Sequence, residues 1–425
     1  MNRFLPLLAC ALVAPPAADA QLRAGVSNVE ITPSALMPMY GYSNRRCGPA
    51  NGTHDPLMAK ALVLEAGASK LAIVTLDLGS IVSPELQRRV ASELNIPVLL
   101  LAASHTHSAP AFLPYGSAPA SNEAANAYRT EMEGKVFAAI QRAAQNMFPA
   151  KLSVGRGSLQ IGYNRLLLRD DGRARALFDN PERVPYGPVD PEFILLRVDD
   201  TDGRARALLV HYATHAVVLG PTSCKYSADF PGVMQRTAEQ QLTGTQVMFV
   251  QGAAGDINPL AMGRSGNEDA DFAVMDKVGQ LLTAEVLKAN KSLHPVAADS
   301  IQSKSDLLTF ADRWEKDKTL DVGITTVLIG PSIAIAAVPG EAMHKLQTTW
   351  KTQADVPHAL FYGYTFSSGG TWAGYIPDLR TAAYGGYGAD ASTRIEVGAG
   401  EKIMLRHLQN LYGLRGMWRD APGRN

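Results

Sequence analysis

Three histidines and one glutamate stand where predicted strands of this chain end. They are His105, His107, His215 and Glu341. Imidazole nitrogens and carboxylate oxygens are ligands that Zn²⁺ takes in proteins. His105 and His107 are two residues apart, so on an extended chain both side chains point to the same face. These residue types predict a metal site, provided that the strand ends meet in space.

The elements that would position these residues alternate between strand and helix along the chain. Apolar runs at 97–103, 205–212 and 332–338 lead into the four candidate ligands, and the run at 246–250 leads into a glycine-containing segment. In open α/β sheets, sites assemble where strands end. The alternation favours an α/β fold with mixed β-sheets layered with helices and the ligands at strand ends. We expect residues 21–425 to form one domain.

Each feature taken singly also has an ordinary structural explanation. A histidine pair, or a lone histidine at a strand end, often only satisfies local hydrogen bonds. Glu341 follows Pro339 and Gly340, where we predict the start of a helix, and a helix dipole stabilises a carboxylate there without any metal. A metal site is therefore predicted by the combination of residues and not by any one of them.

The candidate ligands lie in a series of short motifs between Arg23 and Ile376. The motifs are Ala24–Pro33 (AGVSNVEITP), His54-Asp55, Ser104–Pro110 (SHTHSAP), Tyr163–Arg165 (YNR), Ala213–His215 (ATH), Ser227–Asp229 (SAD), Gly255–Pro259 (GDINP), Val338–Glu341 (VPGE) and Gly374–Ile376 (GYI). In this order they make the chain resemble the neutral/alkaline (non-lysosomal) ceramidase family. Each motif alone is modest, and the specificity lies in their shared order over most of the chain.

The resemblance implies a zinc amidohydrolase. Its metal ligands would be His105, His215, Glu341 and Tyr375, with Zn²⁺ as the cofactor. Tyrosine is a rare zinc ligand, so Tyr375 is expected from the family pattern and not from its chemistry. The choice between His105 and His107 as the direct ligand stays open. We assign the metal to His105. His107 is expected either to transfer protons or to support the ligands without binding the metal directly.

The mechanism that the resemblance implies is attack on an amide carbonyl by zinc-bound water, whose pKa the metal lowers towards ~7. The candidate catalytic residues are His107, Arg165 and Asn258. His107 is expected to give a proton to the leaving amine. Arg165, together with backbone amides around Gly255 and Asp256, is a candidate for binding the oxyanion. A plain ion pair stays an alternative for Arg165.

Two aspartates are candidates for holding a ligating imidazole in place. Asp229 or Asp256 is expected to accept the second N–H of a zinc-bound histidine, which would set the orientation of its ring.

The chain departs from the family pattern in two respects. Asn258 stands where the family has a serine in the catalytic site, and an amide cannot serve as a nucleophile. We therefore expect zinc-bound water to attack, and a substrate different from that of the family. The family also continues into a C-terminal β-sandwich domain, whereas this sequence reaches Asn425 soon after its last predicted helix. We expect the catalytic domain only.

The leading hypothesis is an exported zinc-dependent hydrolase that cleaves an amide (N-acyl) bond. A ceramide-like N-acyl lipid is the substrate that the resemblance implies. A non-lipid amide, an ester or a lactone stays an alternative, because the same attack serves all of them. An alternative from a different class of protein is a non-catalytic exported binding protein, in which the metal only stabilises the structure. An open coordination position beside a cleft would distinguish the enzyme from the binding protein.

Composition argues against several other classes of protein. Lys+Arg and Asp+Glu number 40 each, so the formal net charge of zero disfavours nucleic-acid and anionic-membrane binders. A hydrophobic share of 46% with 19% charged residues is typical of a folded protein and not of a disordered one. We find no apolar run long enough for a stable membrane span, no nucleotide-binding motif and no signal for an oligomeric state.

The first twenty residues are predicted to be a signal peptide. Arg3 supplies a basic start, residues 4–13 form a short apolar run, and Ala18-Asp19-Ala20 is typical of a cleavage site. The mature protein is then periplasmic or secreted after cleavage near Ala20. Cys10 lies in a segment similar to a lipoprotein box, which leaves lipidation as an alternative.

Two cysteines remain in the predicted mature chain. An oxidising compartment favours a disulfide between Cys47 and Cys224. Two buried free thiols are the alternative, and the sequence does not decide between them.

Overall fold

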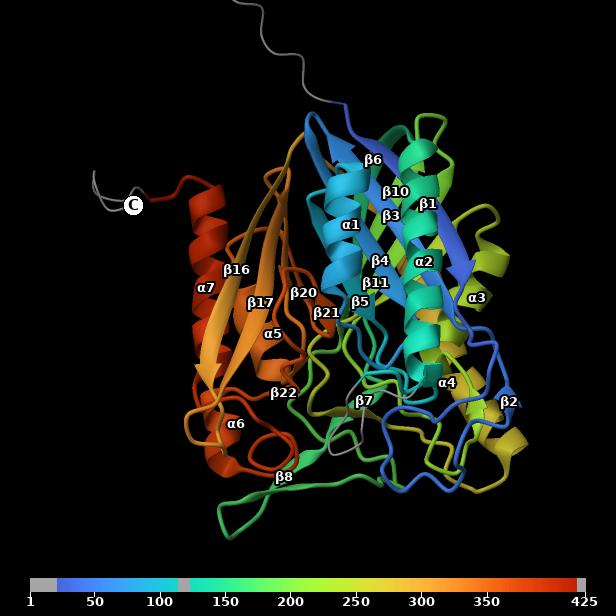
Figure 1. The fold of residues 1–425 in the computed structure, drawn as a ribbon, viewed down its shortest axis with the longest axis vertical. Coiled ribbons are helices and arrows are strands. Elements are labelled where there is room, and N and C mark those ends of the chain that lie inside the picture. Colours follow the sequence, from blue (N-terminus) through green and yellow to red (C-terminus); the bar gives the residue numbers. More distant parts are fainter. Residues whose placement is uncertain (1–20, 114–122, 419–425) are drawn as a thin grey trace, which may run out of the picture.

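Two β-sheets pack face to face, and helices cover the outer face of each (Figure 1). This is seen in a computed structural model that describes residues 21–113 and 123–418. The layers follow the order helices, large sheet, small sheet, helices. The predicted α/β fold with mixed sheets layered with helices is confirmed. The predicted signal peptide, residues 1–20, lies outside the described residues.

The large sheet mixes parallel and antiparallel neighbours. β4 runs parallel to β5, and β11 runs parallel to β13, while the other long neighbours are antiparallel. In order across the sheet the strands are β13 (Gln246–Gln251), β11 (Ala205–Tyr212), β10 (Glu192–Asp200), β6 (Phe148–Ser158), β1 (Arg23–Glu30), β3 (Met58–Ala66), β4 (Ser69–Leu76), β5 (Val98–Ala103) and β21 (Thr365–Phe366), with β15 (His294–Val296) paired to β6. The strand β5 is apolar throughout because both faces of the sheet are covered.

The small sheet holds four strands and packs against the inner face of the large one. Its strands are, in order, β16 (Ile301–Ala311), β17 (Thr319–Ile329), β18 (Ile333–Ala337) and β20 (His358–Tyr362). The core between the sheets joins side chains such as Leu62 and Ile73 from the large sheet to Val327 and Ile335 from the small one. Burying a leucine or isoleucine of this kind contributes about 1.5–3 kcal/mol, so the facing sheets hold each other in place.

Helices cover the two outer faces. The helices are α1 (Pro84–Leu94), α2 (Glu123–Gln145), α3 (Asp229–Gln241), α4 (Glu268–Ala289), α5 (His344–Gln353), α6 (Leu379–Tyr384) and α7 (Ala399–Leu414). α1 and α2 lie on one half of the large sheet, α3 and α4 cover its other half, and α5 and α7 cover the small sheet (Figure 1). None of the described helices is both long enough and apolar enough to span a bilayer.

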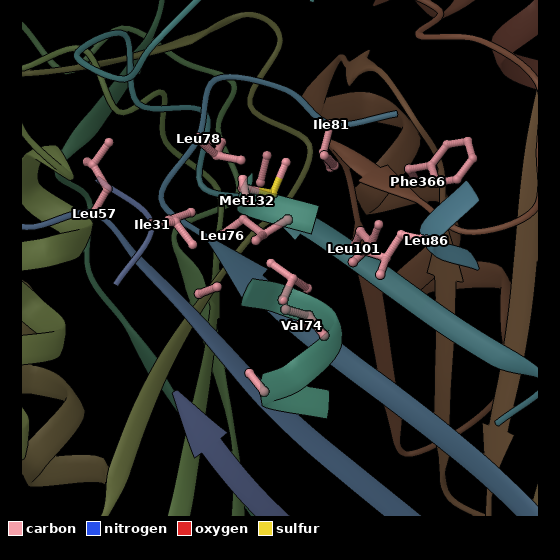
Figure 2. Packing of buried hydrophobic residues seen from close by; sticks show 14 of the residues in the cluster. Ile31, Leu57, Val74, Leu76, Leu78, Ile81, Leu86, Leu101, Met132 and Phe366 are labelled. Atoms are coloured by element: carbon pink, nitrogen blue, oxygen red, sulfur yellow. The ribbon is translucent and has the colours of Figure 1, made fainter. Parts of the chain in front are cut away.

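The start of α1 shows how local sequence sets an element. Ser83 caps the helix by accepting a hydrogen bond from the backbone N–H of Leu86, and Pro84 occupies the first turn. A proline there loses no intrahelical hydrogen bond. One face of α1 then packs through Leu86 beside Leu101 and Phe366 in the core of Figure 2.

Loops that contain short strands form a layer at one end of the sheets. They are β2 (Gly52–Thr53), β7 (Gly162–Asn164), β8 (Leu166–Leu168), β9 (Ala174–Ala176), β12 (Lys225–Tyr226), β14 (Ile257–Pro259), β19 (Glu341–Ala342) and β22 (Tyr375–Ile376). In Figure 1, β7, β8 and β22 lie below the lower ends of the long strands. β14 pairs with β7, and β19 pairs with β22, so segments far apart in the chain meet in this layer.

The structure corrects two expectations about these elements. Glu341 does not begin a helix: it lies in the short strand β19, and α5 starts three residues later at His344. The strands β1, β6 and β16 have no counterpart among the predicted elements. Each carries several polar residues and becomes a strand through its partners in the sheet, because strand propensity depends strongly on tertiary context.

Candidate metal centre and active site

Two imidazoles and one carboxylate meet in the interior, each from a different strand end. His105 follows β5, His215 follows β11, and Glu341 follows β18. The carboxylate oxygen Oε2 of Glu341 lies 3.2 Å from Nε2 of His105 and 3.2 Å from Nε2 of His215. At most 1% of each of these residues is exposed. The predicted convergence of strand ends is therefore present for these three residues.

Backbone carbonyls hold both rings in one orientation. Nδ1 of His105 lies 2.6 Å from the carbonyl oxygen of Gly79, and Nδ1 of His215 lies 2.5 Å from that of Ala254. A carbonyl can only accept, so each Nδ1 carries the proton. In the neutral ring, Nε2 then presents a lone pair towards Glu341. The Nε2 atom of His215 and the Oε2 atom of Glu341 have no hydrogen-bond partner.

Burial and neighbouring groups put these donors in the forms that metals bind. Burial lowers the pKa of His215 to about 4, so its ring is neutral near pH 7. Burial alone would raise the pKa of Glu341, but the rings of His105 and His215 beside it hold that pKa well below its ordinary value. A neutral imidazole and an ionised carboxylate are the states required for metal binding.

The donor set fits a divalent cation. Lone pairs and a carboxylate face each other at van der Waals distance or less, which is unfavourable unless a positive charge lies between them. Two ligands that are each about 2.0–2.1 Å from a tetrahedral zinc lie about 3.3 Å apart, and the separations of 3.2 Å match. Nitrogen and oxygen ligands of this kind suit zinc.

The backbone at His105 is strained. Its φ is +63°, a conformation that residues other than glycine and a few polar ones rarely adopt. Strain of this sort persists where the surrounding structure determines it, and it gathers at functional sites. Here it turns the imidazole into the interior directly after β5, which places it opposite Glu341.

His107 lies beside this cluster and faces a cavity. Its Nε2 is 3.2 Å from Nε2 of His105, and its Nδ1 has no hydrogen-bond partner. Burial, reinforced by His105 and His215, holds the pKa of His107 well below its ordinary value. The ligand nitrogens of all three histidines lie within 4.8 Å of one another. His107 is therefore near enough to be a ligand as well as a proton carrier.

Glycine at position 41 is what allows the chain to pass over His107. Gly41 has φ of +97°, and a Cβ there would lie 2.2 Å from the imidazole ring. Any larger residue would push the ring out of place. The segment after Gly41 also brings Arg45, whose guanidinium donates to the backbone carbonyls of His107, Tyr40 and Ser223.

Arg165, Asn258 and Tyr375 form a second buried group beside the first. Nη1 of Arg165 donates to Oδ1 of Asn258 at 3.1 Å, and Nη2 donates to the hydroxyl of Tyr375 at 3.0 Å. Burial alone would lower the pKa of Arg165, but Tyr375 and Glu341 nearby hold it above its ordinary value. Tyr375 is the register partner of Glu341 in the β19–β22 pair.

A cavity of about 620 Å³ opens onto the second group and onto His107. This volume is typical of a small-molecule site. Its walls include His107, Arg165, Asn258 and Tyr375 from the sequence prediction. His105, His215 and Glu341 are not part of its walls and lie buried behind them. The structure thus brings all seven predicted site residues into one region.

Three further assignments from the sequence are wrong. Asp229 accepts from the backbone of Leu219 and Phe230, and Asp256 accepts from Asn164 and His344. Neither holds a candidate ligand, because backbone carbonyls already hold those rings. The amide of Gly255 donates to the carbonyl of Ala342 at 2.9 Å, so it does not face a substrate oxyanion.

Sequence reasoning missed part of the cavity wall. Tyr42, Phe178, Arg264 and Tyr387 line it without standing in any motif singled out above. Arg264 follows the Gly255–Pro259 motif closely, which was the one available signal. The others reach the cavity only through folding of distant loops.

Cys47 and Cys224 form a disulfide, with Cα atoms 6.0 Å apart. The sequence left this pairing open against two free thiols. The bond joins the segment that follows Gly41 to the loop that follows His215. Residues of both segments line the cavity, so the disulfide braces its rim.

Comparison with known proteins places the chain in a family. The model for "Neutral/alkaline non-lysosomal ceramidase, N-terminal" matches residues 22–278, more than half of the chain. The chain belongs to the neutral/alkaline ceramidase family. The matched region contains His105, His107, Arg165, His215 and Asn258, and membership of this family makes the protein a ceramidase-like hydrolase.

Solved ceramidases share the fold. A ceramidase complexed with C2 superposes with a TM-score of 0.77 over 96% of this chain and 78% of its own, at 18% identity. The neutral ceramidase from Pseudomonas aeruginosa gives a TM-score of 0.75 over 95% of this chain and 76% of its own, also at 18% identity. At this level of identity the likeness shows the fold, and it covers much more of the chain than the family match, which ends at residue 278.

Proposed function

We propose that this protein is a zinc-dependent amidohydrolase that cleaves N-acyl bonds, with a ceramide-like lipid as the substrate that its family suggests. The observation that carries the proposal is the buried meeting of His105, His215 and Glu341, whose lone pairs and charge face one another without a proton to share. We assign the metal to these three residues and to Tyr375.

The remaining site residues support hydrolysis around that centre. Zinc held there would supply a nucleophilic water at neutral pH and an electrophile for the amide carbonyl. His107 is placed to move a proton between the attacking water and the leaving nitrogen, because its ring borders both the cluster and the cavity. Arg165 is placed to bind negative charge that develops on the carbonyl oxygen.

The choice of His105 as ligand over His107 rests on how each ring is held. His105 and His215 both have Nδ1 anchored on a backbone carbonyl, which is the usual support of a ligating histidine. Nδ1 of His107 has no partner, and its ring borders the cavity. A ring with a free nitrogen at a cavity wall suits proton transfer better than metal binding.

A cavity beside the cluster favours an enzyme over a binding protein with a structural metal. A structural zinc site is closed by protein ligands and has no need of an adjoining cavity. The disulfide also supports our proposal that the protein is exported, since such bonds persist in oxidising compartments. We propose a periplasmic or secreted location on this ground together with the leader-like first twenty residues.

The experiment that tests the proposal combines metal analysis with a hydrolysis panel. The panel holds short- and long-chain N-acylsphingosines, simple N-acyl amines, esters and lactones, each assayed with and without a chelator. His215→Ala and Glu341→Gln should each reduce bound zinc from about one per chain to near none, with loss of all activity, because each variant removes a buried ligand from the centre.

His294→Ala serves as the matched control. This histidine is exposed on β15, away from the site, and its loss should leave zinc content and activity unchanged. Full zinc in both site variants would reject the ligand assignment. Activity that survives the chelator in wild-type protein with its zinc removed would reject a metal-dependent reaction.

A further inference from the structure

The cavity wall divides by chemistry. One part is aromatic: the ring centroid of Tyr387 lies 5.2 Å from that of Phe178 and 5.5 Å from that of Tyr375. The guanidinium of Arg165 lies over all three rings. Another part is polar and cationic, with Tyr42 and Arg264. A neutral lipid amide needs only the first kind of surface.

The guanidinium of Arg264 has N–H donors that make no close hydrogen bond. Its Nη2 makes only long contacts, 3.4 Å to the hydroxyl of Tyr42, 3.3 Å to the carbonyl of Val217 and 3.5 Å to Sδ of Met262. Its Nε is buried without a hydrogen-bond partner. No carboxylate among the described residues lies within ion-pair distance of it. Asp179 is the one acidic side chain in the cavity wall.

Backbone contacts of the neighbouring segments fix the position of Arg264. The backbone of Gly263 donates to the carbonyl of Val218 and bridges to Leu219. Gly220 leaves room for the arginine, because a Cβ at that position would lie 2.7 Å from Cδ of Arg264. A partly buried guanidinium with unused donors and no ion-pair partner is unfavourable unless an anion completes it.

The position of Tyr42 links Arg264 to the reacting centre. The ring of Tyr42 lies 5.5 Å from the guanidinium carbon of Arg264 and 4.9 Å, edge to face, from the imidazole of His107. One tyrosine ring therefore separates the cation from the residue that we place at the leaving nitrogen. A group bound at Arg264 belongs to the amine portion of the substrate.

We propose that Arg264, with Tyr42, forms a subsite for an anionic group, a carboxylate or a phosphate, on the amine portion of an amide substrate. N-acyl amino acids are the simplest members of this class. The inference rests on the proposed amide hydrolysis. In that reaction the water oxygen bonds to the carbonyl carbon, the C–N bond breaks, and the products are a carboxylate and an amine that takes up the water protons as ammonium.

Binding is measured first, by calorimetry on the purified metal-containing protein. The probes are ketone analogues in which a methylene replaces the amide NH, so that they resist hydrolysis. They are the analogues of N-octanoylglycine, of N-octanoyl phosphoethanolamine and of the neutral N-octanoylethanolamine. An anionic analogue should bind at least about tenfold more tightly than the neutral one, because it gains charge-assisted hydrogen bonds. The stronger of the two anions identifies the group that the subsite takes.

Variants then assign the preference to one residue. Arg264→Gln should abolish it, and Arg264→Lys should keep part of it, because lysine retains the charge without the planar fork. The matched control is Arg46→Gln, which removes a charge from an exposed position outside the cavity and should keep the full preference. Equal affinity of wild type for anionic and neutral analogues, or an unchanged preference in Arg264→Gln, overturns the proposal.

Hydrolysis of the parent amides separates the two proposals. Zinc-loaded wild type should cleave the anionic amide with a higher kcat/KM than the neutral one, mostly through KM. A binding preference without cleavage of any amide rejects amide hydrolysis and keeps the anion subsite. Cleavage without a binding preference keeps the hydrolase and rejects the subsite.

Discussion

At the scale of single residues, the contact between Arg165 and Asn258 sets this chain apart. Where the family resemblance leads us to expect a serine, the amide oxygen of Asn258 accepts a hydrogen bond from Nη1 of Arg165 at 3.1 Å. The asparagine therefore helps to hold the guanidinium at the cavity wall beside Tyr375. A serine side chain is shorter, so it would leave that N–H of Arg165 to water or to substrate.

Asn258→Ser tests this role. We expect kcat/KM on the best substrate of the panel to fall about tenfold, because Arg165, a charged donor, loses its acceptor. Zinc content should stay the same. Steady-state kinetics and metal analysis measure both. If cleavage of N-acylsphingosines arises only in the serine variant, the native substrate is not a ceramide. An unchanged kcat/KM, equal to that of the exposed control Asn146→Ser, contradicts a role for Asn258.

At the scale of elements, the site is assembled by segments that follow strands, and a covalent bond joins two of these segments. The segment around Cys47 lies against the loop around Cys224 through the disulfide and through hydrogen bonds from Arg45 and Arg46 to Ser223 and Pro221. The proposed ligands His105, His215 and Glu341 lie on other segments, where long strands end. The disulfide should therefore affect substrate binding more than metal binding.

The double variant Cys47→Ser, Cys224→Ser tests that separation. The bond spans a sequence separation of 177 residues, so its loss should lower the free energy of unfolding by about 2–5 kcal/mol. KM should rise while zinc content is kept. Urea unfolding, kinetics and metal analysis measure these effects. Loss of zinc with unchanged KM would place the role of the disulfide at the metal and not at the rim.

At the scale of the whole molecule, both sheets are needed for one centre. The large sheet supplies His105 and His215, while the small sheet leads into Glu341. The packing between the sheets therefore determines whether the ligands meet. A substitution that weakens the packing of either sheet should therefore disturb the site through the interface between the sheets.

The layer of α7 on the small sheet contains a group that couples stability to pH. His407 is fully buried, its Nδ1 is 2.8 Å from the hydroxyl of Thr326, and burial lowers its pKa to about 3, against a small opposing effect of Asp306. Between pH 6.5 and about pH 3, the unfolded chain binds a proton at this histidine and the folded chain does not. Stability from this group is therefore complete above about pH 6.5 and is lost as the pH falls.

We expect His407 alone to account for a loss of about 2–3 kcal/mol in the free energy of unfolding between pH 7 and about pH 4.5. In His407→Gln this share of the loss should disappear, whatever the variant's stability at pH 7. Urea unfolding at the two pH values measures it, and other buried groups cancel in the comparison. Equal losses in wild type and variant would contradict the assignment, and the exposed control His294→Gln should behave like wild type.

From the sequence alone we could predict the candidate metal ligands and where along the chain they stand. Uninterrupted apolar runs predicted the buried strands, and His105, His215 and Glu341 follow the ends of these runs. Such local signals were sufficient for the fold class and for the order of the motifs.

Only the tertiary structure decided how those residues are held and what else faces the cavity. The acceptors that orient the two imidazoles are backbone carbonyls of Gly79 and Ala254, and every residue has a carbonyl, so no side-chain pattern marks them. Arg264 and Tyr42 meet because loops more than 200 residues apart fold together. Contacts of that kind arise from packing between layers, which the local pattern of the chain does not contain.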